Sequence, residues 1–160
     1  MKEELLTAYS PALAMLNNCI NLCPDEFWAD DNKGTPFWRI AYHTLFYTDF
    51  YLSDGPQNFR PWENHLATYN ALGEFTPDGQ KVIITTVYVK EQLKAYLTQL
   101  TEALPNRINE ETLTSPCGFA WVRKSNLGLH LYIIRHIQHH TGQLVERLHG
   151  YGIKGIAWLG

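Results

Sequence analysis

The chain has 160 residues, of which 45% are hydrophobic and 18% are charged. This length and composition exclude a disordered chain and predict one domain over residues 1–160 with a sizeable core. The formal net charge of −3 and the scattered Lys and Arg residues argue against a nucleic-acid-binding protein.

The first ten residues, MKEELLTAYS, are acidic and lack the apolar run of a secretory signal. No apolar stretch approaches the roughly 20 residues that span a bilayer, so no membrane association is expected. The cysteines are sparse and odd in number (Cys19, Cys23 and Cys117), as is typical of a reducing compartment, and we expect a cytoplasmic protein. Cys19 and Cys23 lie four positions apart, and we expect them to fill the core rather than bind zinc.

The first predicted helix carries apolar or small residues every three or four positions from Leu5 to Cys23. Pro11 interrupts the pattern, so either the helix kinks there or Ser10 caps a helix that begins at Pro11. In both cases Pro24 ends the helix.

A second helix is predicted from Thr35–Pro36 to the Ser-Asp-Gly-Pro run at 53–56. The following stretch to residue 80 is rich in Pro and Gly and is typical of a long loop. Residues 81–89 remain ambiguous, because their β-branched side chains favour a strand whereas the sequence after them favours a helix.

A third helix is predicted over residues 90–104, whose Leu and Tyr side chains form one stripe, and Pro105 is expected to begin the next connection. The last helix is predicted from Ser125 or Asn126 to about Leu148. Beyond it, Gly150 and Gly152 are stop signals. Four substantial helices without a secure strand predict an all-α bundle with long connecting loops.

The C-terminal tail, IKGIAWLG, is too apolar to extend freely into solvent. We therefore expect Ile156 and Trp158 to pack back on the body of the domain.

The segment RHIQHHTGQL at 135–144 places three of the seven histidines within five positions. At about 100° per residue, His136 and His140 lie roughly 40° apart, beside the core-facing stripe that includes Ile137. His139 lies towards the edge of that face and His149 points away. Because Ile137 stands where a zinc protease of the His-Glu-x-x-His type carries its Glu, that class is not supported.

His43 lies on the core-facing side of the second predicted helix, together with Ile40 and Tyr47. Burying three imidazoles costs free energy unless each finds a partner. A divalent metal ion would satisfy His43, His136 and His140 together and leave one position open for water or substrate. The alternative is a set of partly buried histidines that hydrogen-bond to neighbouring helices.

Two longer segments resemble the DinB/YfiT-like superfamily: PFWRIAYHTLFYTDFYL at 36–52 and LYIIRHIQHHTGQL at 131–144. The last helix of that superfamily carries His-x-x-x-His followed by a short polar run with Gly and Gln. The similarity extends in outline over most of the chain, through DEFW at 25–28, VYVKEQLKAYL at 87–97 and GFAWVRKS at 118–125.

The resemblance implies a four-helix bundle of up-down-down-up topology, often a homodimer. It also implies a divalent metal ion, typically zinc or nickel, whose ligands correspond to His43, His136 and His140. His139 has no counterpart among the ligands of the superfamily. Some members are thiol transferases that use bacillithiol or mycothiol, and others are described only as metal-dependent hydrolases.

Such a metal would lower the pKa of a bound water or thiol, so the expected activity is metal-dependent hydrolysis or thiol transfer. The alternative is a non-catalytic, stress-responsive module that binds a metal or a small ligand. Gln143 is a candidate contact to the ligands or the substrate, although a capping or interhelical hydrogen bond fits it equally. Tyr47 is a candidate pocket residue, although a buried Tyr more often belongs to the core.

No general base is identified from the sequence. Asp49 and Glu146 point away from the histidine face. In the long loop, Glu63, His65 and Glu74 have the chemistry to act at the site, but nothing in the sequence places them there.

Overall fold

The protein is described by a computed structural model that covers residues 1–32, 34–154 and 156–160. Four long helices make up the domain: α1 (Lys2–Leu22), α3 (Phe37–Tyr51), α4 (Lys90–Arg107) and α5 (Asn126–Gly150). A short helix, α2 (Asp25–Trp28), and a 3₁₀ turn, η1 (Glu110–Thr112), lie in the connections. The described residues form no β-strand, only two isolated bridges, which confirms the predicted all-α class.

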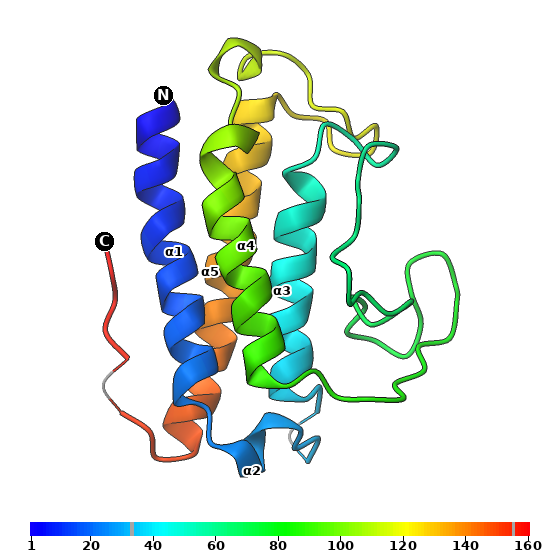
Figure 1. The fold of residues 1–160 in the computed structure, drawn as a ribbon, viewed down its shortest axis with the longest axis vertical. Coiled ribbons are helices and arrows are strands. Elements are labelled where there is room, and N and C mark those ends of the chain that lie inside the picture. Colours follow the sequence, from blue (N-terminus) through cyan, green and yellow to red (C-terminus); the bar gives the residue numbers. More distant parts are fainter. Residues whose placement is uncertain (33, 155) are drawn as a thin grey trace.

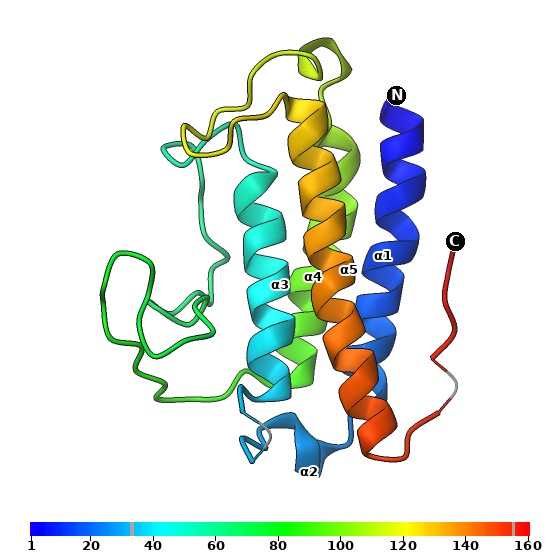
Figure 2. The ribbon, with the colours of Figure 1, turned by 180° about the vertical axis from the view of Figure 1, so that it is seen from behind.

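The four long helices lie side by side (Figure 1; Figure 2). α1 and α5 run from one end of the bundle to the other, and α3 and α4 run in the opposite direction. α1 packs mainly against α4 and α5, and α3 packs against the same two helices. Therefore α3 and α5, which carry the histidines singled out above, are neighbours along their length.

Pro24 and Pro36 lie at helix boundaries as expected, whereas Pro11 and Pro105 lie inside helices. α1 is assigned as one helix through Pro11, so the alternative of a helix that begins at Pro11 is wrong. α4 continues through Pro105 to Arg107, so the expected end at Leu104 is also wrong. A proline removes one backbone hydrogen bond. In α1 buried side chains lie on both sides of Pro11, whereas in α4 the buried side chains all precede Pro105, which lies in the last turn.

The core between the helices consists of two clusters of buried side chains and is rich in aromatic rings. Trp38, Tyr42 and Tyr96 are at most 1% exposed, and Tyr42 contacts the rings of Trp62 and Tyr88 from the long connection. Cys19 and Cys23 are free and buried, as predicted, and burial raises the pKa of each thiol to about 12. The two thiols are therefore packing groups.

The long connection between α3 and α4 is held to the bundle by its own side chains. Residues 81–89, for which the sequence favours neither strand nor helix, are neither: Lys81 forms one isolated bridge with Phe75, and the backbone N–H of Val82 donates to the carbonyl of Glu74. The hydroxyl oxygen of Tyr69 accepts hydrogen bonds from the backbone N–H groups of Thr85 and Thr86. These bonds replace the ladder that a strand would have formed.

The tail behaves only partly as expected. Ile156 packs against the core, but Trp158 is 78% exposed, so the prediction for Trp158 is wrong. The ring lines an open cleft with Glu3, Glu4 and Gln138, among others, whose polar side chains keep this surface in contact with water. Among the described helices, none has the length and apolar character required to cross a membrane.

Candidate metal centre

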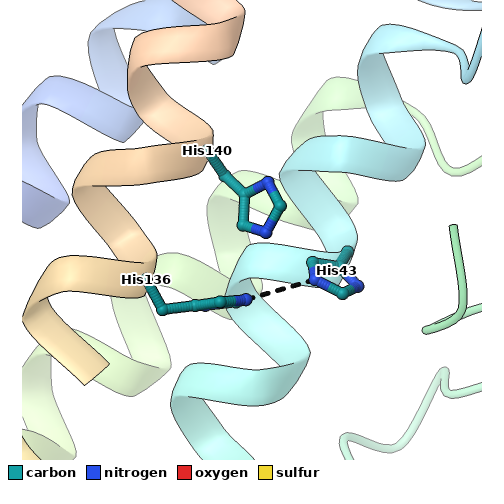
Figure 3. Close-up of side chains that lie close together, drawn as sticks. All are labelled: His43, His136 and His140. Atoms are coloured by element: carbon teal, nitrogen blue, oxygen red, sulfur yellow. Dashed lines mark hydrogen bonds between the residues drawn. The ribbon is translucent and has the colours of Figure 1, made fainter. Parts of the chain in front are cut away.

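The three histidines predicted as metal ligands come together between α3 and α5 (Figure 3). His43 projects from α3, and His136 and His140 project from successive turns of α5. One ring nitrogen from each side chain lies within 4.8 Å of the other two. The closest pair is Nε2 of His43 and Nε2 of His136, which are 3.2 Å apart.

Local sequence fixes the rotation of α5 and hence the direction of its histidines. Ser125 caps the helix, because its hydroxyl oxygen accepts the backbone N–H of Gly128 at 3.2 Å. Ile133, Ile137 and Leu144 are at most 1% exposed and hold one face of α5 in the core. The i, i+4 pair beside that face is therefore directed at α3.

Two of the three ring nitrogens that face away from the centre, Nδ1 of His43 and Nδ1 of His140, form hydrogen bonds. Nδ1–H of His43 donates to the backbone carbonyl of Asn70 at 2.7 Å. Nδ1–H of His140 donates to Oε1 of Gln143 at 2.8 Å. Since both acceptors are carbonyl oxygens, each ring carries its proton on Nδ1 and directs the lone pair of Nε2 inward. Metal-bound histidines are oriented in this way by the groups behind them.

Burial holds the imidazoles in the neutral form that a metal ligand requires. Loss of solvation lowers the pKa of His43 from 6.5 to about 4. Burial, aided by the charges of His140, His43 and His139, lowers the pKa of His136 to about 3. Burial also lowers the pKa of His140, against the opposing effect of the bond to Gln143. All three rings are therefore neutral at pH 7.

A short segment of the long loop lies along α3 and completes this side of the centre. Three successive carbonyls accept hydrogen bonds from the α3 side: Asn70 from His43 at 2.7 Å, Ala71 from Nη2 of Arg39 at 2.5 Å, and Leu72 from the hydroxyl of Thr35 at 3.4 Å. Just before it, Thr68 has a φ of 69°, in the left-handed region that a β-branched residue rarely adopts. The chain is strained where it turns onto α3.

Asn70 is the residue of this site that sequence reasoning missed. Its contact to His43 uses a backbone carbonyl, which every residue possesses, so no side-chain pattern could reveal it. Its side chain adds a second contact, since Nδ2 donates to the hydroxyl oxygen of Tyr47 at 3.2 Å.

The two candidate pocket residues also lie at the centre. The ring centroid of Tyr47 is 4.8 Å from that of His43 and 6.0 Å from that of His136. Gln143 contacts His140 and lines a cleft of about 550 Å³ together with Ile40, Leu72 and Gly142, among others. His139 is exposed and is not a member of the metal-binding group, in line with its predicted position at the edge.

The remaining ionisable candidates lie elsewhere. Asp49 is 3% exposed, but it pairs with Arg107 and accepts the hydroxyl of Tyr96 across the interface with α4. His65 bonds to the hydroxyl of Tyr42 at 2.5 Å. The side chains of three acids expected to be remote or unplaced are exposed: Glu63, Glu74 and Glu146. Within the described residues, no carboxylate joins the three histidines in the metal-binding group.

The other buried histidine of α5, His130, is directed at α1. Its Nδ1 lies 3.0 Å from the hydroxyl oxygen of Tyr9, and both side chains are buried. This pair shows that a buried imidazole in this bundle can be satisfied by an ordinary hydrogen bond. His43 and His136 also hydrogen-bond to each other through Nε2, and what distinguishes these two and His140 is that one ring nitrogen of each lies within 4.8 Å of the other two.

The donor set fits a first-row divalent metal ion. Imidazole nitrogen suits zinc, nickel, copper and iron, whereas calcium and magnesium prefer oxygen ligands. Three histidines also leave part of the coordination sphere for another ligand, which is the arrangement of catalytic rather than structural zinc sites.

Comparisons with protein-family models, with curated proteins and with solved structures found no match for this chain. The functional assignment therefore depends on the geometry of the site and on the resemblance of its two histidine segments.

Proposed function

We propose that the protein is a DinB/YfiT-like metalloprotein that holds a divalent ion, zinc or nickel, through His43, His136 and His140. One observation carries the proposal: three neutral imidazoles converge within 4.8 Å, and two of them are hydrogen-bonded from behind in the tautomer that a metal requires. In the absence of an ion, the Nε2 atoms of His43 and His136 form a hydrogen bond at 3.2 Å, and a metal ion would take the place of the proton between them.

The up-down-down-up topology and the homodimer of the superfamily are part of this proposal. The chain directions in Figures 1 and 2 support the topology. The dimer rests on the resemblance alone, and light scattering coupled to gel filtration tests it.

The activity we propose is metal-dependent hydrolysis or thiol transfer. The bound ion would supply Lewis-acid chemistry, lowering the pKa of a water or a thiol to near neutrality. The chain itself orients the ligands. Asn70 and Gln143 fix the rings of His43 and His140 by hydrogen bonds, and the ring of Tyr47 packs against His43 and His136. Non-catalytic binding of a metal or small ligand is the second candidate, favoured by the absence of a carboxylate from the metal-binding group in the described residues.

Metal analysis tests the site directly. Purified protein is stripped with a chelator and reloaded with Zn²⁺ or Ni²⁺, and bound metal is measured after gel filtration. We expect one ion per chain in the wild type and a loss of binding in His136→Ala. His139→Ala is the matched control, because it removes a neighbouring imidazole that is exposed and outside the group. Wild-type protein that binds no metal, or a His136→Ala variant that binds it fully, contradicts the proposal.

A second experiment separates the enzyme from the binding module. Metal-loaded protein is screened with ester and amide substrates, and with low-molecular-weight thiols and an electrophilic acceptor. Activity that disappears in both the metal-free protein and His43→Ala supports an enzyme. Activity that survives the loss of His43 belongs to another site or to a contaminant.

A further inference from the structure

Tyr47 occupies a distinctive position beside the three histidines. It lies one turn after His43 on α3, and its ring contacts the rings of both His43 and His136. No ring contact joins it to His140. Tyr47 therefore stands at the His43–His136 edge of the centre.

The hydroxyl of Tyr47 accepts one hydrogen bond, but its own proton is not donated in any hydrogen bond between the described residues. Nδ2 of Asn70 donates to the phenolic oxygen at 3.2 Å, which fixes the position of that oxygen. A phenol is both a donor and an acceptor. Among the residues that the structure describes, none accepts the O–H proton of Tyr47 in a hydrogen bond, although the side chain is half-buried. The O–H of Tyr47, half-buried and fixed in place, is therefore suited to donate to a bound ligand.

Asn70 couples this tyrosine to the histidines. Its backbone carbonyl accepts Nδ1–H of His43, while its side-chain amide donates to Tyr47. One loop residue thus fixes both a proposed metal ligand and the aromatic side chain next to it.

We propose that Tyr47 donates a hydrogen bond to the ligand that completes the metal centre, and that Asn70 is the residue that positions it. This inference rests on the proposed metal site. The hydrogen bond from Tyr47 favours ligands that keep a lone pair after they coordinate the ion, such as a carboxylate, a thiolate or a hydroxyl oxygen. A ligand such as imidazole, which has no acceptor left after coordination, gains nothing from Tyr47.

The test uses Co²⁺, whose visible spectrum reports directly on the ligands around it. Co²⁺-loaded wild type and Tyr47→Phe are titrated with acetate and, separately, with imidazole. We expect Tyr47→Phe to bind acetate about tenfold more weakly, because a charge-assisted hydrogen bond is lost, and to bind imidazole with unchanged affinity. Tyr51→Phe is the matched control, since Tyr51 lies on the same helix and its ring contacts Tyr47 without contacting the three histidines.

Asn70→Ala supplies a second, independent variant. It removes the amide but retains the backbone carbonyl that accepts from His43. We expect weaker binding of acetate, and a double variant with Tyr47→Phe that is no weaker than Tyr47→Phe alone, because both substitutions remove the same interaction. Additive losses would overturn the positioning role of Asn70.

The outcomes separate this inference from the proposed metal site. Wild-type protein that fails to bind Co²⁺ overturns the metal site, and this inference with it. Normal Co²⁺ binding with equal acetate affinity in wild type and Tyr47→Phe leaves the metal site standing and overturns the role of Tyr47. An equal loss of affinity for acetate and imidazole also overturns it, because Tyr47 would then act only by shaping the site.

Discussion

The metal-free protein is expected to lose stability between pH 7 and pH 5 because of its buried histidines. Burial lowers the pKa of His43 from 6.5 to about 4 and that of His136 to about 3. Below pH 6.5 the unfolded chain binds protons at these positions and the folded chain does not, so the free energy of unfolding falls as the pH falls. At about 1.4 kcal/mol per pH unit and proton, each histidine removes roughly 2 kcal/mol between pH 7 and pH 5. A total of about 4 kcal/mol is a large part of the 5–15 kcal/mol typical of a domain.

Urea denaturation of chelator-treated protein at pH 7, 6 and 5 measures this decrease. His136→Gln is expected to show a decrease smaller by about 2 kcal/mol, because one buried titrating group is gone. His139→Gln, which removes an exposed imidazole, should show the full decrease. Burial also lowers the pKa of His140, His65 and His130, and these groups add to the decrease in all three proteins. An unfolding free energy that is constant from pH 7 to pH 5 would refute the reasoning.

Three substitutions test other parts of the structure by the same denaturation assay at pH 7. Thr68→Asn is expected to gain about 1 kcal/mol, because Asn tolerates the left-handed backbone that strains Thr68, and a loss would contradict that strain. Gly142→Ala is expected to gain about 0.5–1 kcal/mol, since a Cβ there meets no atom within 4 Å, and destabilisation would mean that this face of α5 is covered. Arg107→Ala is expected to cost about 2 kcal/mol, because it leaves the Tyr96 hydroxyl as the partner of the buried Asp49 carboxylate. This is less than the usual cost of breaking a buried ion pair, since Arg107 is 34% exposed, and an unchanged stability would show that Asp49 is solvated.

The helices could be predicted because hydrophobic periodicity records which face is buried. The pattern predicts the start of α5 at Ser125 or Asn126, and the helix begins at Asn126 with Ser125 as its cap. The expected helix end before Pro105 is wrong, and of the two alternatives at Pro11 the helix start is wrong. The propensity of proline is a local quantity, and in α1 the burial of apolar side chains on both sides of Pro11 is a larger, tertiary one.

The proposed site could be predicted only where it is built from helical side chains. Helical phase placed His136 and His140 on one face and excluded His139, and the structure brings His43 to them from α3. The contribution of Asn70 could not be predicted, because it depends on the path of a loop that is fixed by distant bonds such as those of Tyr69. Loop position follows from tertiary contacts that leave no periodic signal in the sequence.

The cost of burying the histidines and their fitness as ligands have the same physical origin. A solvent-exposed trio of imidazoles would cost little to fold, but protons would compete with a metal for them near pH 6.5. Burial between α3 and α5 moves that competition to about pH 4 for His43 and about pH 3 for His136, at the expense of folding stability in acid. A metal bound only by the folded chain would restore stability by an amount that rises with the logarithm of its affinity. The wild type should therefore gain more stability from metal at pH 6 than a protein with the same three histidines exposed, since its ligands are already deprotonated.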